Sequence, residues 1–139
     1  MSNPQPASPD FIQVSADALS GAQCAQLIQR FNASGSARRG HTGGGLDTTL
    51  KDSWDICISD HAEWKDAENL FNTAMLHHLM AYVRSYPYTV LAPLALRMPD
   101  PLSGELVLLD EAAITGLSDS LLQTLLIKVF RPGTINIQR

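Results

Sequence analysis

The sequence predicts an α+β domain, and three observations carry this prediction. Apolar residues recur with helical spacing in residues 20–33, 60–84 and 118–129. Polar and apolar residues alternate in residues 53–59 and 134–138, which is typical of strands with one buried face. The chain has 139 residues, of which 45% are hydrophobic and 17% charged, and this composition is sufficient for one domain with a hydrophobic core.

The first part of the chain predicts a tail, a short strand and a helix. Residues 1–10 contain three prolines and no apolar signal-peptide core, so we expect a flexible tail before a single domain over residues 11–139. A short strand is expected over residues 11–14. Ser20 and Gln23 have the spacing of a capping box, in which each side chain binds a free backbone N–H of the other residue. The following helix carries one apolar stripe, expected to be buried, of Cys24, Leu27, Ile28 and Phe31.

Residues 34–50 are rich in glycine and are expected to form a mobile loop. They do not match a phosphate-binding P-loop, because that motif follows a strand and precedes a helix, whereas this segment follows a helix and leads into a strand. The strand predicted next has two distinct faces. Its core face is expected to hold Trp54, Ile56 and Ile58, and its opposite face Ser53, Asp55 and Cys57.

The second half of the chain predicts two more helices and a final strand. Asp60 and Glu63 suggest a cap for a long amphipathic helix that runs to about Arg84 and is stopped by Pro87. Residues 85–117 contain four prolines and are expected to form an irregular insertion, in which a short hairpin can fit. Ser118 is expected to cap a helix whose apolar face holds Leu121, Leu122, Leu125, Leu126 and Val129.

Composition argues against several classes of function. No apolar run approaches the roughly 20 residues that span a bilayer, and a net charge of −4 argues against a nucleic-acid partner. The basic pair Arg38 and Arg39 is expected to lie in a loop and is too small to change this. Cys24 and Cys57 are expected to be buried free thiols, because their spacing fits neither a zinc site nor a disulfide framework. We expect a cytoplasmic protein without a membrane partner.

Residue patterns alone do not supply a complete catalytic apparatus. His61 and Glu63 have the HxE spacing that begins a two-histidine, one-carboxylate iron site, but Glu63 suits a helix cap better. His77 and His78 are neighbours on a helix and cannot face one metal, so one is expected to be half-buried and the other solvated. No GxSxG elbow is present, and the acid pairs Asp52 with Asp55 and Asp110 with Glu111 are more typical of surfaces and turns.

The order of the segments resembles a known enzyme family. The capped helix "LSGAQCAQLIQRF", the glycine-rich loop, "KDSWDICIS", the long helix and "VFRPGTINIQR" are similar to the N-terminal half of an Fe(II)- and 2-oxoglutarate-dependent oxygenase of the prolyl-hydroxylase-like kind. The resemblance implies helical support and the first strands of a double-stranded β-helix, or jelly-roll, fold. It also implies hydroxylation or another oxidation of a small-molecule or peptide substrate, with decarboxylation of 2-oxoglutarate.

The resemblance assigns few residues of this chain to the chemistry. In the family, the last strand continues into a tyrosine, a glycine-containing turn and the HxD that holds iron, all of which would lie beyond Arg139. We therefore expect no catalytic and no metal-binding residue here, and no binding of Fe(II) or 2-oxoglutarate by this chain alone. Asn136 and Gln138 would border the 2-oxoglutarate pocket if their face looks into the barrel. The loop over residues 38–50 would lie near the pocket mouth.

Two alternatives stay open at this point. Ile135 and Ile137 can instead face the core while Asn136 and Gln138 face water. The chain can be a non-catalytic α+β interaction or scaffold domain rather than the N-terminal portion of an oxygenase. The sequence fixes neither the substrate nor the oligomeric state.

Overall fold

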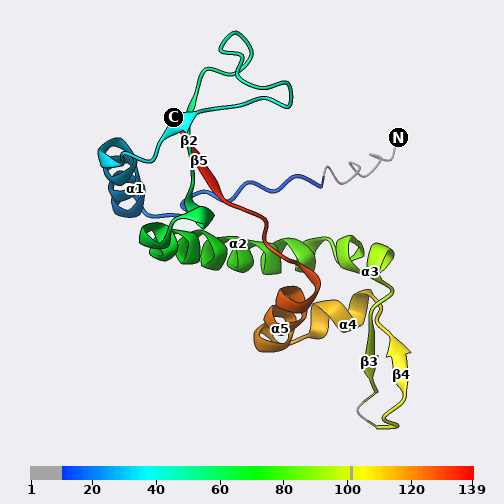
Figure 1. Cartoon of the computed structure of the whole chain (residues 1–139). Helices are drawn as coiled ribbons and strands as arrows, with labels where there is room; N and C mark the ends of the chain where they lie inside the picture. The colour runs from blue at the N-terminus through cyan, green and yellow to red at the C-terminus, as the bar shows by residue number, and fades with distance from the viewer. Residues whose placement is uncertain (1–10, 101) are drawn as a thin grey trace, which may run out of the picture.

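The computed structural model describes residues 11–100 and 102–139, and it has an α+β architecture organised around one long helix. Helix α2 (Lys65–Ser85) crosses the middle of the molecule (Figure 1). A small sheet and helix α1 (Gly21–Ala33) lie beside its first half, and three helices and a hairpin lie beside its second half. Within these residues, no helix is both long enough and apolar enough to cross a membrane.

The larger sheet has three antiparallel strands in the order β1 (Arg38–Arg39), β2 (Trp54–Cys57) and β5 (Asn136–Gln138). In its register, Asp55 lies opposite Gln138 and Cys57 lies opposite Asn136. Because side chains alternate along each strand, these four residues share one face of the sheet, while Ile56 and Ile137 share the other.

A first apolar cluster fixes the isoleucine face of this sheet against the helices. Phe31 from α1 and Trp64 and Ala67 near the start of α2 pack with the strand residues. The fully enclosed members, Ile56 and Ile58, each contribute about 1.5–3 kcal/mol through burial. Two partly buried isoleucines, Ile135 and Ile137, complete the contact. The sheet therefore has a helix-covered face and a helix-free face.

A second apolar cluster holds the other end of α2. It joins α2 to α3 (Tyr88–Leu94), α4 (Glu111–Gly116), α5 (Asp119–Val129) and the hairpin of β3 (Arg97–Pro99) and β4 (Leu106–Leu108). Arg84 adds a polar tie, because its guanidinium donates to the carbonyls of Thr115 and Leu117 and to Asp119, at 2.7–2.9 Å. The buried side chains of this cluster are Val83, Val90, Leu109, Ile114, Leu122 and Leu126.

Several predicted caps and helices are confirmed. The capping box of Ser20 and Gln23 is present, and the Ser118 side chain accepts from the backbone N–H of Leu121 at the start of α5. Helix α2 ends just before Pro87. The cap predicted from Asp60 and Glu63 is wrong: two short 3-10 helices, η1 (Ile58–Asp60) and η2 (Ala62–Trp64), precede α2, which has no side-chain cap.

The structure also corrects three segments. Residues 11–14 form no strand, and the Phe11 carbonyl accepts from the hydroxyl of Tyr82 at 2.8 Å. Residues 85–117 contain a short hairpin, formed by β3 and β4, as the sequence allowed, but the rest is not irregular, since α3 and α4 lie there as well. Arg38 and Arg39 lie in an edge strand and not in a loop.

Candidate functional site

The helix-free face of the sheet carries a polar groove of about 440 Å³. Strands β2 and β5 form its floor, and the segments on either side of β1 and β2 form its walls. The groove combines cationic, anionic and amide side chains, and they include Arg38, Lys51, Asp55, Cys57, Asn136 and Gln138.

Asp55 is the centre of the polar network in this groove. Lys51 Nζ lies 2.6 Å from Asp55 Oδ2, and the Ser53 hydroxyl donates to Oδ1 at 2.7 Å. The hydrogen bond from Lys51 is the main reason that the pKa of Asp55 lies below its ordinary value, and partial burial works in the opposite direction. Asp55 is therefore an ionised acceptor whose oxygens are already engaged.

Gly40 allows this network to form. Its N–H donates to the carbonyl of Ser53 at 2.9 Å, which brings its Cα against the strand. A Cβ added at this position would lie 2.2 Å from Ser53 Oγ and 2.8 Å from Lys51 Cε. Glycine is therefore favoured here by packing, because any side chain would force these neighbouring side-chain atoms to move.

Cys57 lies in the same groove, but its environment does not activate it. Its pKa is raised chiefly by a hydrogen bond with Asp60, and partial burial and the charge of Asp60 add to the effect. A thiol with a raised pKa is protonated at neutral pH and is a poor nucleophile. The expected burial of the second thiol is wrong, because Cys24 is exposed.

Asn136 and Gln138 face the groove, whereas Ile135 and Ile137 pack against the helix-covered cluster. The last strand therefore has the orientation in which its isoleucines face the core and its two amides face away from it. The two amides are exposed and lie directly opposite Cys57 and Asp55 across the β2–β5 pair. Their role as a wall of the 2-oxoglutarate pocket stays a prediction.

The histidines and acids singled out as possible iron ligands lie apart. In residues 11–100 and 102–139, no group of three His, Cys, Asp or Glu side chains is placed to hold a metal ion. His61 Nδ1 faces Glu63 Oε1 at 3.4 Å, and His77 is exposed while His78 is half-buried. An iron centre of the two-histidine, one-carboxylate type needs three converging ligands, so the described residues do not fit one by themselves.

The acid pairs have structural roles. Asp52 forms an ion pair with Arg39 at 2.5 Å, and Asp110 caps α4 by accepting from the backbone N–H of Ala113 at 2.8 Å. These contacts explain their positions without acid–base chemistry.

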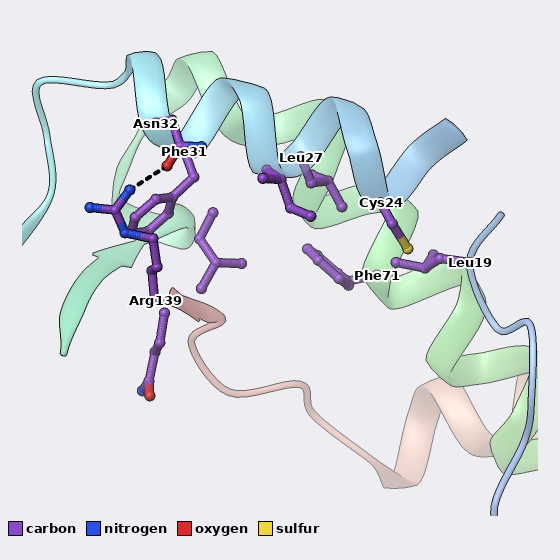
Figure 2. A pocket seen from close by; sticks show the side chains of 10 residues that line it. Leu19, Cys24, Leu27, Phe31, Asn32, Phe71 and Arg139 are labelled. Carbon is purple, nitrogen blue, oxygen red and sulfur yellow. Dashed lines mark hydrogen bonds between the residues drawn. The ribbon is translucent and has the colours of Figure 1, made fainter. Parts of the chain in front are cut away.

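A second hollow of about 370 Å³ opens between α1 and the end of β5, and it is apolar (Figure 2). The stripe predicted on α1 faces this hollow and is less buried than expected, since Ile28 is 61% exposed. At one end, the Arg139 guanidinium donates to Asn32 Oδ1 at 2.6 Å, which ties the last strand to α1. The apolar lining is made by Leu19, Cys24, Leu27, Phe31, Phe71 and Ile137.

Sequence patterns missed part of the polar groove. His41 lies in the loop over residues 38–50 that the resemblance puts near the pocket mouth, but nothing in the local sequence marks Lys51, which folding brings to the β2–β5 face. The close approach of Gly40 to Ser53 gives no sequence signal either.

Comparisons of this chain with family models, with curated proteins and with solved structures find no match.

Proposed function

We propose that this chain forms the N-terminal portion of an Fe(II)- and 2-oxoglutarate-dependent dioxygenase of the jelly-roll type, located in the cytoplasm. One observation carries the proposal: the antiparallel β1–β2–β5 sheet is covered by helices on one face and lined by polar side chains on the other. A jelly-roll oxygenase needs this asymmetry, because its supporting helices lie outside the barrel and its reaction cavity lies inside. In this proposal the polar groove is one wall of that cavity.

The groove also offers the chemistry that a dicarboxylate requires. Asn136 and Gln138 can each donate two hydrogen bonds from an amide group, and Lys51 adds a cation beside them. Lys51 is already paired with Asp55, so the proposal turns on the two amides, which lie beside it in the groove. We assign Asn136 and Gln138 to the 2-oxoglutarate side of the cavity wall, where they orient the co-substrate by hydrogen bonds.

The groups that carry out the oxidation are not assigned to this chain. Bound Fe(II) and 2-oxoglutarate would supply oxygen activation with decarboxylation of the co-substrate. The resemblance puts the iron ligands and the cation for the distal carboxylate after Arg139. The residues described here provide the wall, its support and its hydrogen-bond donors.

The decisive test compares this chain with the product of its intact gene. We expect Fe(II)-dependent conversion of 2-oxoglutarate to succinate by the longer product, and no measurable binding of Fe(II) or 2-oxoglutarate by the 139-residue chain alone. Sequencing the locus gives a first answer, because a stop codon directly after Arg139, or no HxD within about twenty codons, would contradict the proposal. That outcome would favour the interaction or scaffold domain, for which the open apolar hollow beside α1 is the supporting observation.

A matched pair of variants tests the assigned wall in the longer product. Gln138→Ala is expected to raise KM for 2-oxoglutarate several-fold while the stability of the protein changes little, because the side chain is exposed. Gln123→Ala removes the same group from the exposed side of α5, outside the groove, and is expected to leave KM unchanged. Equal kinetics for both variants would remove Gln138 from the site.

A further inference from the structure

The β3–β4 hairpin projects beyond α3 and α4, away from the sheet and the polar groove (Figure 1). In its turn, Asp100 Oδ1 accepts from the backbone N–H groups of Leu102 and Ser103 at 2.8 Å. These bonds also hold the pKa of Asp100 below its ordinary value. Gly104 closes the turn with a positive φ of 73°. The three residue pairs of the β3–β4 ladder, together with these turn contacts, define the hairpin.

The two faces of the hairpin differ in burial, although Val107 on the inward face of β4 is itself 43% exposed. One face points inward, where Leu109 is buried and Leu96 and Met98 pack against the second apolar cluster. The other face carries Leu106 and Leu108, which are 63% and 61% exposed. The register places both leucines opposite β3 residues that are exposed as well. An apolar row is therefore presented outward on the edge strand of a two-stranded sheet.

The backbone of β4 is open along the same edge. Asp100 N donates to Glu105 O, and Leu109 N donates to Leu96 O, each at 2.8 Å, which makes these the hydrogen-bonded pairs of the ladder. The alternation of an antiparallel ladder then turns the N–H and C=O groups of Leu106 and Leu108 to the outer edge. The outer edge of β3 is blunted, since Pro99 has no N–H to donate. The β4 edge is the one that can accept a further strand.

Charge decides which kind of strand fits. Glu105 lies just before β4, and Asp110 and Glu111 lie just after it, all exposed. If two copies of this chain paired antiparallel about Val107, Glu105 of each copy would come next to Asp110 of the other, and like charges there are unfavourable. A strand with apolar residues in its middle and cations at its ends has no such conflict.

We propose that the β4 edge is a docking site for an extended segment of a partner protein, with alternating apolar residues flanked by lysine or arginine. The segment adds as a third strand, its backbone bonds to Leu106 and Leu108, and its apolar side chains cover the exposed leucine row. Its basic ends lie beside Glu105 and Asp110. Because the strand is short and the covered area small, the complex is weak, with a dissociation constant of roughly 0.1 mM. This inference does not depend on the proposed oxygenase function.

The test is a titration followed by NMR on the full chain with a capped Lys-Val-Thr-Val-Lys peptide. We expect saturable shifts of the Leu106 and Leu108 amide signals, and no comparable shifts with the matched Glu-Val-Thr-Val-Glu peptide. Glu105→Lys is expected to weaken binding of the lysine peptide about fivefold and to strengthen binding of the glutamate peptide. Leu106→Lys is expected to abolish both, with an unchanged circular dichroism spectrum because the side chain is exposed.

Three results would overturn the proposal. The first is the absence of any shift on β4. The second is equal binding of the two peptides, which would show that charge does not select the partner. The third is a change of the β4 signals with the concentration of the chain in the absence of peptide, which is lost in Leu106→Lys. This result would show that a second copy of the chain occupies the edge.

Discussion

The replacement Gly40→Ala tests the packing on which the polar groove depends. The added Cβ would lie 2.2 Å from Ser53 Oγ, 2.8 Å from Lys51 Cε and 3.0 Å from Asp55 Oδ2, all closer than ordinary contact. The hydroxyl must move by about 1 Å or more to reach an ordinary contact distance, which breaks its 2.7 Å hydrogen bond to Asp55. That bond to an ionised group is worth about 1.5 kcal/mol, and the remaining overpacking costs about 1 kcal/mol.

We therefore expect Gly40→Ala to lower the free energy of unfolding by about 2–3 kcal/mol. Urea unfolding followed by circular dichroism measures this as a midpoint lower by about 1 M. Gly43→Ala is the matched control, because nothing lies within 4 Å of its added Cβ, and its expected effect is within about 0.5 kcal/mol. Introducing Ser53→Ala first removes the closest contact and is expected to reduce the cost of Gly40→Ala. Equal stability of the Gly40 and Gly43 variants, or an unchanged cost without the hydroxyl, would refute the reasoning.

Three further predictions concern single groups. Asp55→Asn is expected to make the free energy of unfolding depend less on pH below about 4. In the native protein, the lowered pKa of Asp55 stabilises the fold above the ordinary value of 3.8, and this stabilisation is lost as the pH falls. Urea unfolding at several pH values between roughly 2.5 and 6 measures this difference. Iodoacetamide is expected to alkylate Cys57 more slowly than Cys24, and Asp60→Asn to speed the reaction at Cys57, as read by mass spectrometry. Arg84→Ala is expected to cost about 2 kcal/mol in thermal or urea unfolding, because it leaves carbonyls of α4 and its C-cap without their donor.

Local signals in the sequence predicted much of the helical part of the fold. The Ser20 and Ser118 caps, the stop at Pro87 and the spacing of the leucines in α5 all depend on residues close together in the chain. Such signals fix α1, α2 and α5 within a few residues.

Elements that depend on distant partners were harder to predict. Strand β1 has two residues and no pattern of its own, and it exists because β2 pairs with it. The apolar segment at residues 11–14 has strand-like composition but is not a strand in the structure. Helix α3 contains Pro93, and a proline in this segment argues against a helix in a prediction from sequence. The burial of Val90 in the second apolar cluster nevertheless stabilises the helix.

The same limit applies to the candidate site. Alternation correctly separated Asn136 and Gln138 from the isoleucines of the last strand, and the structure decides which set faces the core. Lys51 and Gly40 could not be assigned, because their importance depends on contacts made only after β1 and β2 come together.

Helix α2 has a mechanical consequence for the whole molecule. Its 21 residues extend over roughly 31 Å, and its buried residues lie toward its two ends, Ala67 in one cluster and Val83 in the other. Between them, the partly buried Phe71 packs against the first cluster and the partly buried Leu76 against the second, so the two halves of the helix are anchored in different clusters. Hydrogen exchange should therefore divide the chain into two cooperative units that meet within α2, the one helix that contributes residues to both clusters.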